Sequence, residues 1–194
     1  MSLLLLFNNQ ALRVEETPSV VLKALLIPEA KTREGLLIRA VATPWFEILE
    51  RIRRNPEAIY EFDSRTWEEI VAGAYRHAGF DDVLLTPRSG DKGRDVVATK
   101  RGVGSIRIFD QVKAYRPGHL VTAAEVREMI GVITGAHNVS KGLVTTTSNF
   151  APRVEEDEYI KPLIPYRLEL KPRETLLSWL EEVAASEPPE TRKR

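Results

Sequence analysis

Residues 89–113 constrain the fold of this chain more than any other stretch. A polar segment with two glycines, residues 89–95, runs directly into the apolar residues Val96-Val97-Ala98. Residues 106–113 then alternate apolar and polar side chains, which is the period of a β-strand. Because the intervening residues 100–105 carry two more glycines and polar side chains, the simplest structure for the whole stretch is a β-hairpin.

This hairpin is predicted to gather three polar side chains. Gln111 and Lys113 are two residues apart, and such residues share one face of a strand. In the simplest pairing register, Asp95 arrives beside them. A carboxylate, an amide oxygen and an ammonium group that converge can hold a divalent metal ion and a phosphate. Asp110 is expected to point to the opposite face and to be structural.

The first 55 residues are predicted to form a small α/β extension. Its helix is expected to begin near Pro44, because proline suits a first helical turn. This extension could equally serve packing, dimerisation or recognition of the substrate. Apolar runs typical of strands precede this helix at residues 3–7, 20–27 and 36–42.

Residues 56–186 are predicted to form the main domain, and 187–194 a frayed tail. Ser64 is the expected N-cap of the first helix in this domain. Thr122 and Glu125 have the spacing of a capping box, which makes Glu125 a cap rather than a catalyst. The remaining elements are expected as a helix at 64–79, a strand at 81–86, the hairpin, a helix at 122–136, a strand at 141–147, a strand within 162–170 and a helix at 174–184.

One acidic residue of the helix at 64–79 could serve the hairpin site. At about 100° per residue, Glu69 points opposite the buried Trp67, whereas Glu68 lies at the flank of the buried stripe. Glu68 is therefore the candidate. The alternative is that both glutamates are exposed to solvent and occur in the first turn only because the helix dipole favours acidic residues there.

Charge and composition limit the classes of function. The 194-residue chain has no net charge, which argues mildly against an obligate nucleic-acid binder. Residues 86–116, however, carry eight Lys or Arg against three Asp, a local field that suits a polyanion. The absence of cysteine excludes disulfides and thiolate chemistry. The apolar run at 3–7 is too short to span a bilayer, so a cytoplasmic protein is expected.

The element order α-β-β-β-α-β with Asp95 and Gln111-Val112-Lys113 resembles the PD-(D/E)xK nuclease superfamily, and within it the Mrr-type restriction endonucleases. The motifs follow the family's order over about residues 63–170. Gln111 replaces the superfamily's usual Glu, as is common in the Mrr branch. The first 55 residues do not resemble the winged-helix domain of many Mrr proteins. The motifs that carry the resemblance are Trp67-Glu68, Gly79-Phe80, Val83-Leu84-Leu85-Thr86, residues 89–95, Gln111-Val112-Lys113 and residues 146–150.

The resemblance implies a restriction-endonuclease-like α/β fold, with a central mixed sheet flanked by helices, and a Mg²⁺-dependent DNA endonuclease in restriction or defence. Mn²⁺ could substitute, and no small-molecule cofactor or membrane partner is expected. Lys113 would orient the attacking water or offset charge on the phosphate. The metal would be held by Asp95, Gln111, the Val112 carbonyl and Glu68, and DNA phosphates would be contacted by Ser89, Arg94, Tyr115, Arg116, Ser148 and Asn149.

Three further expectations accompany this reading. A homodimer is expected, because cutting both strands needs two active centres. A structure-selective nuclease for DNA repair or junction resolution could use the same core. A catalytically silent DNA-binding or scaffold module is the alternative from outside the enzymes.

Overall fold

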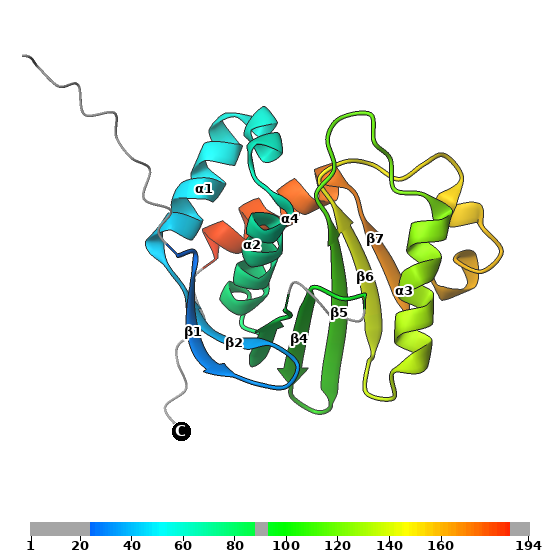
Figure 1. Ribbon diagram of the computed structural model, residues 1–194, viewed down its shortest axis with the longest axis horizontal. Helices are drawn as coiled ribbons and strands as arrows, with labels where there is room; N and C mark the ends of the chain where they lie inside the picture. Colours follow the sequence, from blue (N-terminus) through cyan, green and yellow to red (C-terminus); the bar gives the residue numbers. More distant parts are fainter. Residues whose placement is uncertain (1–23, 88–92, 187–194) are drawn as a thin grey trace, which may run out of the picture.

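A seven-stranded sheet, in the order β1-β2-β3-β4-β5-β6-β7, organises the computed structural model, which describes residues 24–87 and 93–186 (Figure 1). Neighbouring strands from β1 to β5 are antiparallel, and β5, β6 and β7 are parallel. Helices cover both faces of this mixed sheet. The predicted α/β fold class is therefore confirmed.

The elements within the described residues follow one another in a simple order. No helix among them has the length and apolarity to cross a bilayer. The strands are β1 (Leu26–Lys31), β2 (Leu36–Val41), β3 (Asp82–Leu85), β4 (Val96–Arg101), β5 (Ser105–Lys113), β6 (Lys141–Thr146) and β7 (Leu168–Lys171). The helices are α1 (Thr43–Arg54), α2 (Ser64–His77), α3 (Ala123–Gly135) and α4 (Arg173–Ala185), with short 3₁₀ helices η1 (Pro56–Glu61), η2 (Val154–Glu156) and η3 (Lys161–Leu163).

Strand alternation divides the hydrophobic core into two parts. On one face, α1, α2 and α4 pack against Val96, Ala98 and Val112. On the other face, α3 packs against Val97 and Phe109. Since successive side chains of a strand point to opposite faces, the two-residue steps from Phe109 along β5 place Gln111 and Lys113 on the face of α3.

The N-terminal hairpin extends the main sheet. β2 pairs with β3, with Leu36 opposite Leu85, so the sheet runs across the predicted boundary at residue 55. The turn before β2 lies close to β3, because a Cβ atom on Gly35 would lie 2.3 Å from the carbonyl oxygen of Leu85. Only glycine fits there, and its φ of +151° also favours glycine.

Two predicted boundaries near the N-terminus differ from the structure. The strand expected at 20–27 begins at Leu26 and runs to Lys31, because its partner β2 fixes its register through the turn at residues 32–35. Asp63 and not Ser64 is the N-cap of α2, and its carboxylate accepts the Thr66 N–H at 2.7 Å. An ionised cap also interacts favourably with the helix dipole. The expected strand at 3–7, residues 20–23 and the tail lie outside the described residues.

The strand expected within 162–170 begins only at Leu168. Pro162 lies in η3 and Pro165 lies in the turn at residues 164–167, and neither has an N–H group to donate to a ladder. Two helix starts, by contrast, are confirmed. Pro44 lies in the first turn of α1, and Thr122 and Glu125 form both bonds of the capping box.

Asp110 is buried beneath α2 and α4, on the face opposite the predicted site, as expected. Its Oδ2 accepts hydrogen bonds from the Tyr75 hydroxyl at 2.9 Å and the Thr145 hydroxyl at 3.0 Å. Burial raises the pKa of Asp110 to about 6, although Lys171 and these hydrogen bonds act in the opposite direction. Burial also lowers the pKa of Lys171, whose ammonium lies 3.6 Å from the centre of the Trp179 ring.

We predict that Asp110 makes stability depend on pH between about 4 and 6. The pKa of this carboxyl is about 6 in the folded chain, against 3.8 for an aspartate in water, so folding favours its protonated form. Its contribution is therefore fully present below pH 4 and is lost as the pH rises through 6. Asp110→Asn should remove this dependence. The unfolding free energy of wild type relative to the variant should rise by roughly 2–3 kcal/mol from pH 7 to pH 4.

Urea denaturation of both proteins across this pH range measures that difference. Asp82→Asn, which changes a carboxylate with 35% of its side chain exposed, is the matched control. If the difference in unfolding free energy between wild type and Asp110→Asn stays constant with pH, the prediction is contradicted.

Candidate active site

The pairing of β4 with β5 brings Asp95 to Gln111 and Lys113. Val96 lies opposite Asp110, and the Asp95 N–H donates to the Asp110 carbonyl at 2.9 Å. The Asp95 Oδ2 atom accepts the N–H of Val112 at 2.7 Å. Because Val112 stands between Gln111 and Lys113 in the chain, the carboxylate is held between the two other predicted site residues.

Gln111 presents a buried oxygen. Its Oε1 atom has no hydrogen-bond partner within residues 24–87 and 93–186. A buried acceptor without a partner costs about 1–3 kcal/mol, so such an atom calls for an occupant. Amide and carboxylate oxygens are the ligands that Mg²⁺ accepts. The pair Asp95 and Gln111 therefore fits a hard cation.

The site contains few acidic side chains. Within residues 24–87 and 93–186, no three His, Cys, Asp or Glu side chains are grouped so as to hold a metal ion. An ion at Gln111 would therefore depend on Asp95, on oxygen atoms of uncharged groups and on water.

Among the described residues, Glu68 is connected to this region through Arg65. The two side chains form an ion pair of 2.7 Å on α2, with 15% and 19% of their side chains exposed. Arg65 also donates to the Thr86 carbonyl at 2.9 Å. The Thr86 N–H in turn donates to the Asp95 carbonyl at 2.9 Å. The start of α2 is thereby connected to the segment that carries Asp95.

The sequence contains one indication of the role of Arg65. It lies three residues before Glu68 on a helix, and side chains at that spacing are neighbours that can form an ion pair. Its second partner, Thr86, lies 21 residues away and gave no local signal.

Lys113 stands at the end of β5 with 17% of its side chain exposed. Its Nζ lies 3.9 Å from Glu125 Oε1 and 3.8 Å from Glu128 Oε2. Its carbonyl accepts the Thr146 hydroxyl at 2.8 Å, so the backbone is held by β6. The ammonium group is therefore on the predicted site's face and is surrounded by carboxylates at ion-pair distance.

The predicted phosphate contacts at the ends of β5 and β6 differ in exposure. Ser148 is buried, whereas Asn149 and Arg116 are exposed. Tyr115 stacks on His119, with ring centres 4.0 Å apart. Ser89 lies outside the described residues.

Arg94 lies against the sheet rather than in solvent. Its guanidinium carbon is 4.2 Å from the centre of the Phe109 ring, and 13% of the side chain is exposed. Glu34, in the turn between β1 and β2, accepts from Arg94 at 3.3 Å and from Arg107 at 2.7 Å. Two arginines of the basic hairpin region thus share one carboxylate of the N-terminal hairpin.

We predict that Arg94→Ala destabilises the fold by about 1–2 kcal/mol, because it removes the contact with Phe109 and one partner of Glu34. Chemical denaturation measures this loss. Arg116→Ala, at an exposed arginine, should change stability by less than about 0.5 kcal/mol. An Arg94→Ala protein of unchanged stability that binds DNA poorly would show instead that this arginine serves only the ligand.

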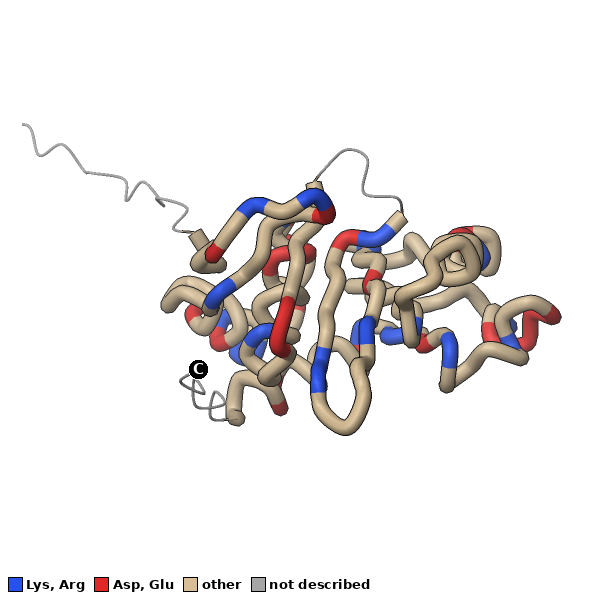
Figure 2. Tube along the Cα trace, turned by 90° about the horizontal axis from the view of Figure 1, so that it is seen from below, with Lys and Arg blue, Asp and Glu red and all other residues tan. Residues whose placement is uncertain are grey.

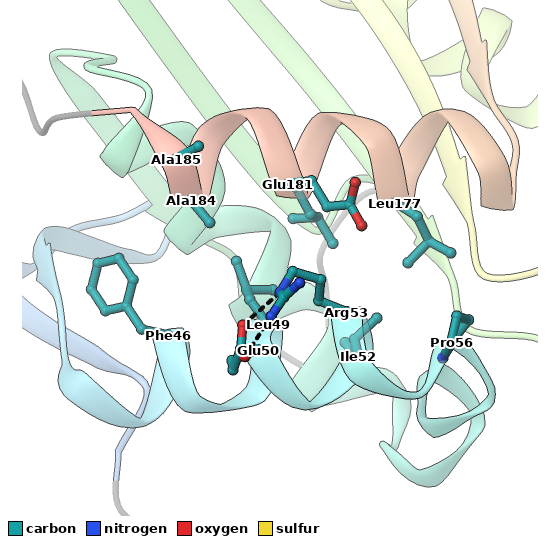
Figure 3. A pocket seen from close by; sticks show the side chains of 11 residues that line it. Phe46, Leu49, Glu50, Ile52, Arg53, Pro56, Leu177, Glu181, Ala184 and Ala185 are labelled. Atoms are coloured by element: carbon teal, nitrogen blue, oxygen red, sulfur yellow. Dashed lines mark hydrogen bonds and ion pairs between the residues drawn. The ribbon is translucent and has the colours of Figure 1, made fainter.

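A separate hollow of about 600 Å³ lies between α1 and α4 (Figure 3). Phe46, Leu49 and Leu177 are among the apolar side chains that line it. Glu50 and Arg53 also line it and form an ion pair of 2.7 Å with each other. It includes none of the predicted site residues. Elsewhere, acidic and basic positions are interspersed along the described chain (Figure 2).

Two solved restriction endonucleases resemble this structure. The structure of MspJI in complex with a 27-mer oligonucleotide matches with a TM-score of 0.50 and 18% identity, over 81% of this chain and 35% of that chain. The DNA modification-dependent restriction endonuclease AspBHI matches with a TM-score of 0.45 and 19% identity, over 86% of this chain and 41% of that chain. The chain therefore spans less than half the length of either enzyme. The likeness to MspJI shows a shared fold.

A family comparison gives the relationship directly. No curated protein matches the chain. The model of the Mrr catalytic family, described as restriction endonuclease, matches residues 59–180, which is more than half of the 194 residues and includes the whole β4–β5 hairpin. The chain therefore belongs to the Mrr-type restriction endonuclease family.

Proposed function

We propose that this protein is a divalent-metal-dependent DNA endonuclease that acts in restriction of foreign DNA. The observation that carries the proposal is the buried amide oxygen of Gln111, which has no partner among the described residues and lies beside Asp95 on the face of Lys113. Membership of the restriction endonuclease family supports it. A restriction role would place the protein in the cytoplasm.

The metal of this proposal is Mg²⁺, with Mn²⁺ as a substitute and no small-molecule cofactor. Asp95, Gln111 and the Val112 carbonyl would hold it, with Glu68 contributing through water. When bound, the ion would neutralise charge on the scissile phosphate and make a bound water more acidic.

The protein's own groups would position the reactants. The Val112 N–H holds one oxygen of the Asp95 carboxylate, so this ligand is oriented before any substrate arrives. The Lys113 ammonium would orient the attacking water or offset the negative charge that develops on the phosphate. Its fixed backbone at the end of β5 reduces the motion that would weaken this effect.

DNA is the proposed partner. The MspJI structure contains an oligonucleotide, which supports a DNA-binding role for the shared fold. Cutting both strands would need two active centres, and a homodimer would supply them. The proposed phosphate contacts are Ser89, Arg94, Tyr115, Arg116, Ser148 and Asn149.

We predict that Lys113→Ala and Asp95→Ala abolish DNA cleavage, with losses of at least about 100-fold. Each change removes a group that acts only at the reacting phosphate or its metal, so DNA affinity should fall much less. Cleavage of plasmid in the presence of Mg²⁺ or Mn²⁺, together with binding measured without metal, tests both parts.

Lys100→Ala is the matched control, because Lys100 is an exposed lysine toward the far end of β4. Methylated, unmethylated and branched DNA should all be used, so that a restriction enzyme and a repair nuclease are distinguished. A wild-type protein that cuts none of these substrates would contradict the enzyme proposal and favour the DNA-binding scaffold.

We also predict that Gln111→Glu raises the affinity for Mn²⁺ by about tenfold or more, because it adds a charged oxygen ligand beside Asp95. The same change should lower the melting temperature without metal, since it brings a carboxylate close to Asp95 in a partly buried site. Titration calorimetry and thermal unfolding measure the two effects. The substitution Gln111→Leu, of similar size, should abolish metal binding. Equal metal affinity in all three proteins would exclude Gln111 as a ligand.

A further inference from the structure

Glu125 makes more contacts than a helix cap requires. Its Oε2 atom accepts from the N–H and the hydroxyl of Thr122, both at 2.9 Å, and this completes the capping box of α3. Its Oε1 atom faces the other way. It accepts the Tyr115 hydroxyl and lies 3.9 Å from the Lys113 ammonium. One carboxylate therefore joins the start of α3 to two residues at the end of β5.

The backbone around Lys113 is held independently of Glu125. The Lys113 carbonyl accepts from the Thr146 hydroxyl at 2.8 Å and from the Thr147 N–H at 3.2 Å. The Thr147 hydroxyl donates to the Tyr115 carbonyl at 2.8 Å. These bonds fix the main chain, but they leave the four-carbon side chain of Lys113 to be placed by its charged neighbours.

Two carboxylates of the described residues lie within ion-pair distance of that side chain, and they differ in exposure. Glu128 is 3.8 Å from Lys113 Nζ, but 62% of its side chain is exposed. Glu125 has 20% of its side chain exposed and is restrained by three hydrogen bonds. An exposed, mobile carboxylate contributes little to an ion pair, whereas a restrained and partly buried one contributes more. Glu125 is therefore the group that can fix the ammonium.

We infer that Glu125 is a positioning residue that holds Lys113 at the reacting phosphate, an inference that rests on the proposed nuclease function. Hydrogen bonds from Tyr115 and Thr122 occupy both of its oxygens. The separation of 3.9 Å from Lys113 Nζ is longer than a hydrogen bond. The carboxylate thus keeps the ammonium near without taking its N–H donors, which stay available to a phosphate oxygen or a water.

This arrangement also assigns Tyr115 a part in the same network. Its hydroxyl donates to Glu125, and burial and this carboxylate raise the pKa of Tyr115 to about 12. The phenol therefore keeps its proton and supports Glu125. Contact with DNA would then come from the Tyr115 ring or from Arg116, which is exposed.

Glu125→Gln in the full chain tests the inference, because glutamine also completes a capping box but carries no charge toward Lys113. We expect kcat for plasmid cleavage to fall by about tenfold or more, with KM changed by less than about threefold and the melting temperature preserved. Thr122→Val is the comparison variant. It removes the cap hydroxyl, one of the three hydrogen bonds to Glu125, but keeps the carboxylate and its bonds from Tyr115 and the Thr122 N–H, so it should lower the melting temperature and lower kcat much less than Glu125→Gln does.

A double-mutant cycle separates positioning from a general structural effect. In a Lys113→Ala background, Glu125→Gln should have no further effect on residual cleavage, because the group it positions is gone. Glu128→Gln should lower kcat by less than about threefold, in line with its exposure. Unchanged kcat in Glu125→Gln, or an equal loss with and without Lys113, would overturn the inference.

Lysine labelling gives a readout that needs no activity. Acetylation followed by mass spectrometry should modify Lys113 several-fold faster in Glu125→Gln than in wild type or Thr122→Val, with Lys100 as the internal reference. An unchanged rate at Lys113 would overturn the inference even in an inactive protein. If wild type cuts no DNA, the proposed function fails, while the labelling result still decides whether Glu125 holds Lys113.

Discussion

The hydrogen bond from the Val112 N–H to the Asp95 carboxylate ties the core and the site to one strand register. β4 and β5 are paired so that Val96 lies opposite Asp110. A slip of one residue would exchange every side chain between the two faces of β5. Val112 would leave the core of α2 and α4, and Gln111 and Lys113 would enter it. The apolar pattern that stabilises the sheet thus also sets the position of the polar groups.

β5 holds two neighbouring polar residues on opposite faces of the sheet. Asp110 Oδ2 accepts from Tyr75 and Thr145. Asp110 Oδ1 and Gln111 Oε1 are both buried without a partner among the residues that the structure describes. A fold tolerates such a local cost most readily where a ligand is to replace the missing partner. The unsatisfied oxygen of Gln111 differs from that of Asp110 in its neighbours, because it lies on the face of Asp95 and Lys113, whereas Asp110 lies among Tyr75, Thr145 and the helices.

The hairpin could be predicted from the sequence because its signals are local. Alternation in residues 106–113 and the glycine-bearing turn before β4 determine which side chains share a face. The network of Glu34 with Arg94 and Arg107 could not be predicted. It joins residues 60 and 73 positions apart, and nothing in the turn at residues 32–35 indicates its partner. The start of β7 at Leu168 could not be predicted either. Whether a proline ends a strand depends on which strand lies beside it, and the sequence does not show that.

The same network changes how the basic character of the hairpin should be understood. Residues 86–116 contain eight Lys or Arg, but Arg94 and Arg107 are paired with Glu34, and Arg101 is paired with Asp82. Charges already paired within the protein release few counter-ions when a polyanion binds. The electrostatic part of the proposed DNA affinity would therefore be smaller than the residue count indicates. Under the proposed function, positioning of the phosphate would then depend more on directed groups, the exposed Asn149 and the restrained Lys113, and on a cation at Gln111. A total charge of zero agrees with this proposal.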